Sequence, residues 1–511
     1  MGGKVIVVGA GAAGIYATWL LRRQGVDVTC FEASPYPCGR TRAYEKDGYI
    51  CETGALGVET QWDFEPQLIK DVGLSGEYAA GTTMRVGFWR KNRLNLVGIG
   101  TAAQQLSWLR ETLGFRGIPL KAIRQAIKVA LAINKELKQI EAQGKDVHAN
   151  SFEALLPFGD VRLDEYVLEH GGKEALDYIF QPFMSLMILG SAPDTCVTHM
   201  MCLFINNSQG MSESGGFGWM KRGIGSIYEA AYGMDEECYR LSCPVDEIVI
   251  EDGAVTGVRA GGEFFPADHV ICCTTASKVA QITPELPQAI ADDLACVRYA
   301  STYHYMFGDR KKFTPDEFTM EFFASTPEDP KPLIRVCLDA AQRSDAYTPY
   351  GREKGTLLHV LTSYEHEERL MAMSDEERLK LVMDETRKLF PDMPEDLELC
   401  ECLYLPEAIS LDAPGQMPAM HDYETNHLDD VRGFHLAGEY LHPAASAEGA
   451  CITARRAAGR VLEQMGMPGL PGCKAESAAP APKASAKDVA VPAGTAVAGF
   501  AAGVAIGRRT K

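Results

Sequence analysis

The chain has 511 residues, an apolar fraction of 46% and a formal net charge of −19. This length predicts two or more domains, because a single hydrophobic core rarely grows beyond about 250–300 residues. The apolar fraction excludes wholesale disorder. The acidic charge argues against a nucleic-acid partner, whose binding requires clustered lysine and arginine.

The fifteen cysteines form no C-x-x-C pair and no zinc-like cluster with histidine, so we expect no metal site. The chain starts directly on an apolar strand pattern and shows no signal peptide. We therefore expect a cytoplasmic protein with free thiols. The adjacent Cys272 and Cys273 fall in an apolar run, which favours a place in the core over a redox pair.

The first forty residues read as a strand, a glycine-rich turn, a helix and a second strand. The segments are Lys4–Val8, Gly9–Gly14, Ile15–Gln24 and Val26–Phe31, and the second strand ends at Glu32. This order is the dinucleotide-binding fingerprint, in which the N-terminus of the helix attracts the charge of a pyrophosphate.

Each glycine of the turn has its own task in that fingerprint. Gly9 permits the tight turn, Gly11 lets the backbone approach the pyrophosphate, and Gly14 allows the helix to pack closely on the strand. Ala13 lies in the same turn and is a further candidate contact. Glu32, about twenty positions downstream, can bind the ribose hydroxyls.

The next segments indicate which dinucleotide is bound. Gly39-Arg40-Thr41 forms a turn, and Glu52-Thr53-Gly54-Ala55 follows. The chain here resembles the superfamily of flavin amine oxidases, protoporphyrinogen oxidase and phytoene-type desaturases, whose members place a Gly-Gly-Arg turn and a D/E-x-G-A-like segment against FAD. The resemblance implies that Gly39, Arg40 and Thr41 contact FAD. Cys38 stands where the family has its first glycine, which is a departure.

The resemblance returns near the end of the chain. Gly433–Glu439 reads as a short strand closing on a Gly-acid pair, and Glu448-Gly449-Ala450 opens a helix. The resemblance implies that Gly438 and Glu439 bind the ribityl or pyrophosphate region, and that Glu448, Gly449 and Ala450 face the pyrimidine end of the flavin. No cysteine occupies a covalent-flavin position between Pro406 and Gly433, so we expect non-covalent FAD.

A predicted hairpin lies between these two regions. Val245–Ile250 and Val255–Val258 are strands joined by the turn Asp252-Gly253, and Ala267–Ile271 follows. The resemblance implies that the backbone of Val245 contacts adenine. An ordinary hairpin without this contact remains the alternative.

The expected fold is α/β, with a discontinuous Rossmann-like FAD-binding domain and a mixed α+β substrate domain. The resemblance assigns residues 1–75, 211–290 and 401–465 to the FAD-binding domain. It assigns a helical cap at 76–210 and the stretch 291–400 to the substrate domain. In these stretches we expect a helix within Ala102–Gln143, strands at Leu333–Leu338 and Thr356–Ser363, and a charged helix over Ser374–Phe390.

The sequence leaves open the roles of the Met-rich segments and of the C-terminal tail. The Met-rich segments Phe183–Met187 and His199–Phe204 could line an apolar pocket, although a buried helix core is the more common explanation. Residues 466–511 read as a linker followed by an Ala/Gly-rich tail. In residues 489–507, Gly499, Gly503 and Gly507 follow a small-xxx-small spacing, so we weigh membrane association against a disordered or partner-binding tail.

Flavin enzymes of this superfamily transfer a hydride between substrate and flavin N5. Leu294–Tyr299 lacks the lysine that is typical of amine oxidases, and the loop Pro443–Ala447 is small where theirs is bulky. These features favour a desaturase-like or reductase-like enzyme acting on a small hydrophobic substrate. Tyr440 and His442 are our candidate catalytic groups, and packing is the alternative for both.

Two further functions remain open, a peroxide-producing flavin amine oxidase and a non-redox flavin-binding isomerase or carrier. Only one complete nucleotide fingerprint occurs in the chain. We therefore expect oxygen, a quinone, another carrier or a second organic substrate as the electron acceptor or donor.

Overall fold

A five-stranded parallel sheet forms the nucleotide-binding half of the molecule in the computed structural model. The sheet has the order β10-β2-β1-β14-β20. The strands are Tyr239–Arg240, Asp27–Phe31, Lys4–Val8, His269–Cys272 and Phe434–Leu436. β1 pairs with β2 and with β14, so that Val5 lies opposite both Val28 and His269. The predicted α/β Rossmann-like fold is confirmed.

The structure describes most but not all of the chain. The described residues are 3–59, 62–80, 84–90, 93–99, 118–145, 147, 152–210, 217–316, 318–322 and 331–470. The predicted tail and the part of the predicted helix at 102–117 lie outside them. Within the described part, none of the helices has both the length and the apolarity needed to cross a bilayer.

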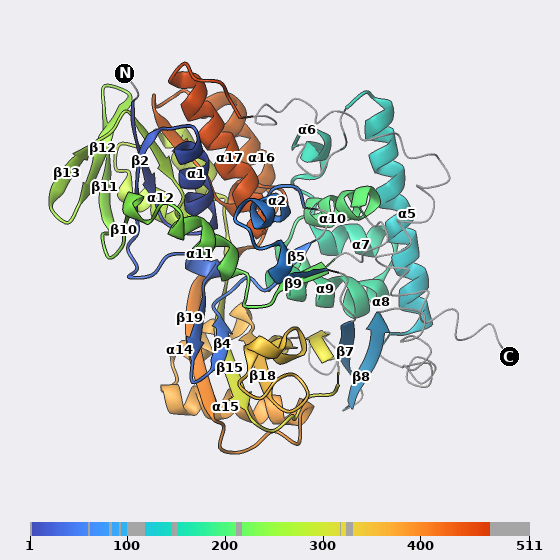
Figure 1. Ribbon diagram of the computed structural model, residues 1–511. Coiled ribbons are helices and arrows are strands. Elements are labelled where there is room, and N and C mark those ends of the chain that lie inside the picture. The colour runs from blue at the N-terminus through green and yellow to red at the C-terminus, as the bar shows by residue number, and fades with distance from the viewer. Residues whose placement is uncertain are drawn as a thin grey trace.

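Alternating side chains of the parallel sheet enter two different cores. Val5, Val7 and Ile271 pack beneath α1 (Ala12–Arg23), α11 (Gly225–Gly233) and α17 (Ala447–Gln464). Ile6 and Val270 point to the opposite face, where they meet the antiparallel sheet β11-β12-β13 and helices α12 and α13. These elements are Val245–Glu251, Ala254–Ala260, Glu263–Pro266, Ala276–Ile282 and Gln288–Ala295. Figure 1 shows the small sheet flanking the parallel one.

A seven-stranded sheet forms the second half of the molecule, below the first in Figure 1. Its order is β19-β15-β18-β17-β16-β7-β8. The strands are Leu399–Ser410, Tyr299–Asp309, Thr356–Thr362, Ile334–Asp339, Phe318–Phe322, Met84–Arg90 and Arg93–Ile99. Helix α15 (Asp375–Leu389) covers one face, as the charged pattern over Ser374–Phe390 predicts, and Ser374 caps it with a capping box.

This pairing moves one expected domain boundary. β19 runs alongside β15 from Leu399 to Ser410, so residues 401–410 belong to the seven-stranded sheet. The boundary expected between 400 and 401 therefore falls inside a strand, because antiparallel pairing carries the chain ten residues further before it returns to the parallel sheet. The remaining division into domains stays an interpretation.

The described part of 118–210 is helical. It contains α5, α7, α9 and α10, which span Leu120–Ala142, Leu163–His170, Gln181–Ile188 and Val197–Gly210. The predicted helix at 102–143 is thus present from Leu120 onward. Met184 and Met201 are fully buried in one core with Leu155 and Ile188, which supports the core interpretation of the Met-rich segments.

The three strands β5, β9 and β6 link the two halves of the molecule. They span Val58–Glu59, Phe217–Met220 and Tyr78–Ala80 and form a small antiparallel sheet. Helix α2 (Phe64–Asp71) lies between β5 and β6 in the chain and packs against α17.

Candidate functional site

The glycine-rich turn after β1 is tight on one side and open on the other. A Cβ atom at Gly14 would lie 1.8 Å from the carbonyl oxygen of Gly9, whose φ is +98°. A Cβ atom at Gly11 would meet nothing within 4 Å. Gly11 is the N-cap residue of α1 and supplies no side-chain cap. The positive end of α1 therefore faces open space, which suits a pyrophosphate.

Glu32 organises the edge of this opening. Its carboxylate accepts hydrogen bonds from the backbone N–H of Ala10 (2.7 Å) and of Ser34 (2.8 Å). The backbone N–H of Cys243 donates to the carbonyl oxygen of Glu32 at 2.8 Å, which brings the start of β11 at Val245 beside the acid. The structure thus joins the predicted ribose-binding and adenine-binding residues. Each carboxylate oxygen keeps a second lone pair for a ribose hydroxyl.

The turn that contains Arg40 lies directly against the glycine loop. Cys38 donates its backbone N–H to the carbonyl oxygen of Ala10 at 2.7 Å, and a Cβ atom on Gly39 would lie 3.3 Å from Cα of Gly11. Cys38 has φ +76°, in the left-handed region that favours glycine. The departure from the family pattern therefore preserves the backbone conformation. The Thr41 hydroxyl donates to the carbonyl oxygen of Cys38 at 2.7 Å.

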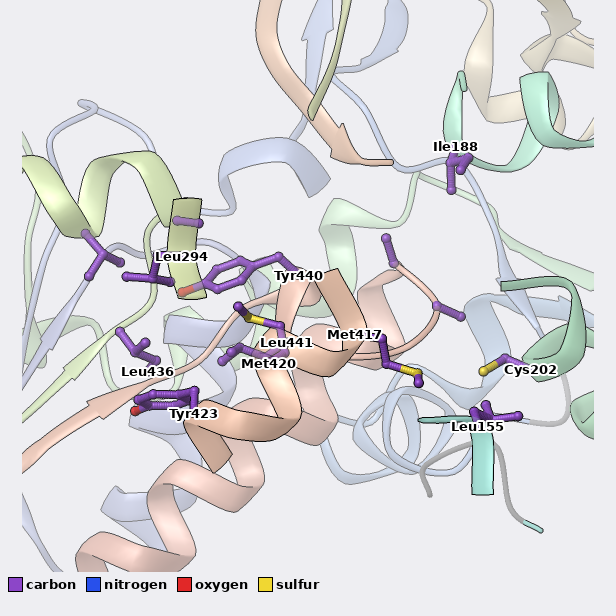
Figure 2. Close-up of a cluster of buried hydrophobic side chains, with 14 of the residues drawn as sticks. Leu155, Ile188, Cys202, Leu294, Met417, Met420, Tyr423, Leu436, Tyr440 and Leu441 are labelled. Carbon is purple, nitrogen blue, oxygen red and sulfur yellow. The ribbon is translucent and has the colours of Figure 1, made fainter. Parts of the chain in front are cut away.

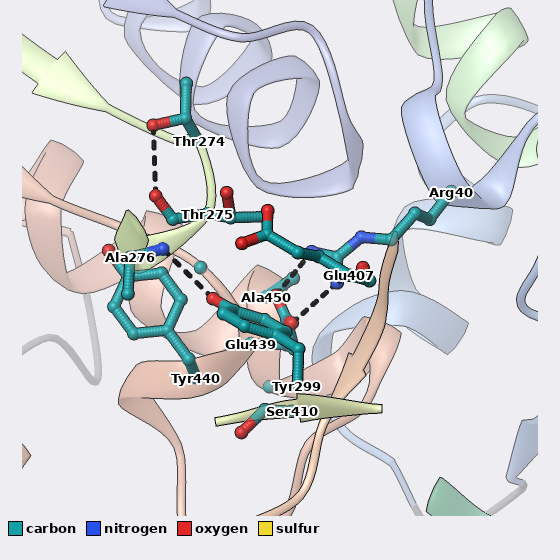
Figure 3. A network of polar contacts seen from close by, with 12 residues as sticks. Arg40, Thr274, Thr275, Ala276, Tyr299, Glu407, Ser410, Glu439, Tyr440 and Ala450 are labelled. Atoms are coloured by element: carbon teal, nitrogen blue, oxygen red, sulfur yellow. Dashed lines mark hydrogen bonds and ion pairs between the residues drawn. The ribbon is translucent and has the colours of Figure 1, made fainter. Parts of the chain in front are cut away.

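Arg40 and Glu439 bring the two ends of the fingerprint together. The guanidinium group donates two parallel hydrogen bonds to the carboxylate, at 2.8 and 2.7 Å, and a third to the carbonyl oxygen of Glu407 at 3.2 Å. Figure 3 shows this pair beside Tyr299, whose hydroxyl oxygen accepts the backbone N–H of Ala276 at 3.0 Å. Residues 399 positions apart are thus fixed in one polar network.

The first turn of α17 is hydrogen-bonded to the start of helix α2. Ser446 caps α17 by accepting the backbone N–H of Gly449 at 3.0 Å, and Gly449 and Ala450 lie in this first turn. The carboxylate of Glu448 accepts three backbone N–H groups at 2.8 Å each, at the start of α2 (Asp63, Phe64 and Glu65). Contact of this turn with the flavin stays a prediction, and the side chain of Glu448 is engaged with α2.

Tyr440 and His442, the candidate catalytic residues, are both buried. Figure 2 shows the ring of Tyr440 beside Leu294, and its hydroxyl has no hydrogen-bond partner among the described residues. Nδ1 of His442 contacts the backbone of Ala444 in its own loop. This placement favours the packing alternative, and a catalytic role for either residue stays a prediction.

A small cavity with room for about one water molecule lies beside these two side chains. It is lined by Thr198, Asp412, Gln416, Met417, Met420, Tyr440, His442 and Pro443. Asp412 is buried and bonds to Nδ1 of His199, and it accepts the backbone N–H of Ala445 at 3.0 Å. Asp412 therefore fixes the loop that leads into α17. No local motif marks this pair in the sequence.

Arg343 forms a buried ion pair with Glu52, in the Glu52–Ala55 segment. Arg343 donates to the Glu52 carboxylate at 3.3 Å and to the carbonyl oxygen of Leu56 at 2.8 Å. Its guanidinium carbon lies 4.0 Å from the centre of the Trp219 ring. In the sequence Glu52 stands out only as part of the Glu52–Ala55 segment, and nothing marks Arg343 as its partner, because the two residues are 291 positions apart.

The contact between two buried histidines, His304 and His359, could not be predicted from the sequence either. They lie on β15 and β18 with 2.8 Å between Nε2 of His304 and Nδ1 of His359. The only signal was a single histidine inside each of two otherwise apolar strands.

Outside this site, ligand atoms of Asp293, Asp422 and His427 lie within 4.8 Å of one another. Burial and then the charge of Asp422 raise the pKa of Asp293 to about 6. Such a cluster by itself does not define a metal site.

The fold and the site together define an FAD-dependent oxidoreductase built on a Rossmann domain. A family model of flavin containing amine oxidoreductases matches residues 12–462, and the chain belongs to this family. The fit of FAD rests on the open approach at Gly11, the uncapped start of α1 and the carboxylate of Glu32.

Individual relatives agree with this family. Coproporphyrinogen III oxidase of Staphylococcus aureus is 36% identical over 93 residues, which are 18% of this chain and 20% of that protein. L-amino acid oxidase Bs29 of Bothriechis schlegelii is 25% identical over 323 residues, 61% of each chain. The chain thus spans between one fifth and about three fifths of the length of these curated relatives.

A solved structure shares the fold. It belongs to a provisionally assigned protoporphyrinogen oxidase from Exiguobacterium, with a TM-score of 0.70 and 17% identity. The match covers 91% of this chain and 99% of the other.

Proposed function

We propose that the protein transfers a hydride between an apolar organic substrate and non-covalently bound FAD, in a desaturase-like or reductase-like reaction. The observation that supports this proposal is a buried apolar cluster on the side of the seven-stranded sheet opposite α15. Its members Ala300, Val336 and Leu361 come from the sheet, and Leu189 after α9 and Leu411 after β19 pack against them. The same face carries His304, whose Nδ1 lies 3.0 Å from the carbonyl oxygen of Thr53, and the backbone N–H of Ala55 donates to the carbonyl oxygen of Arg40 at 3.0 Å.

The residues of the site have distinct tasks in this proposal. The Gly9–Gly14 turn and the start of α1 hold the pyrophosphate, and Glu32 holds the ribose. Arg40 and Glu439 orient the central part of the cofactor. Bound FAD supplies the hydride acceptor or donor at N5. The apolar cluster excludes water from this side of the site. Oxygen, a quinone or another carrier completes the electron transfer.

A second candidate is oxidation of an amine or amino acid with release of peroxide. The similarity to L-amino acid oxidases favours it. The buried arginines on this side of the sheet argue against an amino-acid carboxylate as the ligand. Arg335 is paired with Glu365, and Arg343 is paired with Glu52. A carboxylate ligand would have to compete with these glutamates.

An anaerobic spectral screen of the purified holoenzyme tests these candidates. Bleaching of the flavin by an apolar alcohol or polyene, and not by L-amino acids or alkylamines, supports the proposal. Bleaching by an amine, with peroxide formed in air, supports the second candidate. A flavin that no donor bleaches, and that no organic acceptor re-oxidises after chemical reduction, identifies a non-redox isomerase or carrier. Protein that stays colourless after reconstitution with FAD contradicts all three.

Association of residues 489–507 with a membrane is a separate proposal. Co-sedimentation of the full chain with lipid vesicles, lost in a chain that ends at Leu470, supports it. Equal behaviour of the two chains contradicts it.

A further inference from the structure

His304 and His359 lie on the face of the seven-stranded sheet that is turned away from α15. Their strand neighbours Tyr303, Tyr305, Leu358 and Val360 pack into the core beneath α15. Successive side chains of a strand point to opposite faces, so the two imidazoles point to the other side. Leu357 and Leu361, which flank His359 on its own face, belong to other cores. Both histidines are 0% exposed.

The hydrogen bonds of this pair fix both tautomers. Nδ1 of His304 lies 3.0 Å from the carbonyl oxygen of Thr53, which can only accept, so Nδ1 carries the hydrogen. Burial lowers the pKa of His304 to about 4, so its ring is neutral and Nε2 is an acceptor. His359 must therefore donate from Nδ1 across the 2.8 Å contact. The lone pair of His359 is left on Nε2.

His359 stays neutral for physical reasons. Burial lowers its pKa well below the ordinary value, and the neighbouring His304 and Arg343 lower it further. Nε2 is buried and has no hydrogen-bond partner among the described residues. A buried acceptor without a partner destabilises the folded state, and a bound hydrogen-bond donor would offset this cost.

We propose that Nε2 of His359 accepts a hydrogen bond from a hydroxyl or N–H group of the substrate and so positions it. The inference rests on the proposed function and narrows its substrate class to an apolar skeleton that carries at least one such donor. His304 is a positioning residue that holds His359 in the required tautomer and connects it to Thr53, in the segment expected to lie against FAD.

A site with a buried acceptor discriminates strongly between ligands that differ only in a donor. Phenol and toluene are suitable probes, because they have nearly the same shape and only phenol has a donor. Each is titrated into oxidised holoenzyme, and the shift of the flavin absorbance gives its Kd. We expect phenol to bind about tenfold more tightly than toluene.

Variants separate this role from a merely structural one. His359→Phe should abolish the preference for phenol. His359→Gln should retain part of it, because the amide can donate to His304 and still present an oxygen. His304→Phe should reduce it. His366→Phe is the matched control, since that ring contacts the carbonyl oxygen of Lys331 outside the site. The flavin-to-protein ratio reports whether each variant folds.

A second readout does not depend on activity. Nitrogen-15 NMR of histidine-labelled holoenzyme, with the signal assigned by its absence in His359→Gln, should show a neutral ring protonated at Nδ1. The inference is overturned if the hydrogen lies on Nε2 of His359, if the two probes bind with equal affinity, or if phenol shows no measurable binding. If an organic electron donor still bleaches the flavin, the proposed function survives that result. If no electron donor bleaches it and no organic acceptor re-oxidises the reduced flavin, the proposed function fails by itself.

Discussion

Gly11 and Gly14 lie three positions apart, yet an added methyl group has opposite consequences at the two sites. At Gly14 it would collide with the backbone of Gly9, whereas at Gly11 it would enter open space. We expect Gly14→Ala to destabilise the apoprotein by about 1–3 kcal/mol, the usual cost of overpacking. Gly11→Ala should leave apoprotein stability nearly unchanged and weaken FAD binding by about tenfold or more, since the methyl group occupies the approach to the pyrophosphate.

Thermal unfolding of FAD-stripped protein and titration with FAD measure these two effects separately. Gly233→Ala is a suitable control, because a Cβ atom there also meets nothing within 4 Å but Gly233 lies at the end of α11. An apoprotein of Gly11→Ala as unstable as that of Gly14→Ala would contradict the assignment of Gly11 to the cofactor.

At the scale of single residues, the sequence predicts those residues whose surroundings follow from a local motif. Gly14 and Glu32 belong to one short motif, and the structure gives both the expected surroundings. The Arg343–Glu52 ion pair and the His304–His359 pair could not be predicted. Each depends on contacts between distant strands and loops, and neither partner carries a local pattern that identifies the other.

The contact between α2, α11 and α17 contains a buried carboxyl group without a cationic partner among the described residues. Glu65 accepts the hydroxyl of Tyr228 at 2.6 Å, and its Oε2 atom has no partner in the described part of the chain. Burial raises the pKa of Glu65 to about 8, although the hydrogen bond from Tyr228 opposes this shift and the charge of Glu448 adds to it. The folded state therefore favours the protonated acid.

This elevated pKa predicts a pH-dependent stability. Its contribution is complete below the unfolded-state pKa of about 4.3 and is lost as the pH rises through the folded value of about 8. Glu65→Gln removes the titration while it keeps the size of the side chain. We expect the variant to exceed the wild type in stability at about pH 9 by roughly 1–4 kcal/mol, and to lose this advantage toward about pH 5.

Thermal unfolding across this pH range provides the measurement, and the exposed Glu353→Gln serves as the control. Glu448 titrates in both proteins and its charge raises the pKa of Glu65, so the difference between the two proteins reports Glu65 together with this coupling. Parallel stability curves for wild type and Glu65→Gln would show that Glu65 is ionised in the folded state.

The capping box of α15 gives a second prediction for a single element. Ser374 accepts the backbone N–H of Glu377 at 3.3 Å, and the Glu377 carboxylate accepts the backbone N–H of Ser374 at 3.0 Å. Ser374→Ala should cost about 1 kcal/mol of local stability. Amide hydrogen exchange of α15 should therefore accelerate, while the flavin-to-protein ratio stays unchanged because α15 covers the face of the sheet away from the site. Unchanged exchange in α15 would contradict the prediction.

Helix α15 could be predicted almost to the residue, because its cap, its charges and its apolar period are all local signals. The end of β19 could not be predicted in the same way. Residues 401–410 belong to the seven-stranded sheet only through their pairing with β15, about one hundred positions earlier in the chain.

In the whole molecule, distant chain segments meet around the proposed cofactor site. The glycine loop, Glu32 and Arg40 come from the first segment, Val245 from the middle, and Glu439 with the start of α17 from the last. The parallel sheet unites them, because β14 and β20 extend the pairing that begins at β1. FAD should therefore stabilise the molecule as a unit rather than a single segment.

This organisation predicts that FAD stabilises the apoprotein more than riboflavin does. Riboflavin lacks the pyrophosphate and the adenosine, so it cannot use the start of α1, Glu32 or the start of β11. At one hundred times its Kd, FAD should raise the free energy of unfolding by about 2.7 kcal/mol, whereas riboflavin at the same concentration should raise it far less. ADP, which carries only the other half, should stabilise the apoprotein measurably. The measurement is the unfolding midpoint of apoprotein with each ligand, and equal stabilisation by riboflavin and FAD would show that the fingerprint does not hold the cofactor.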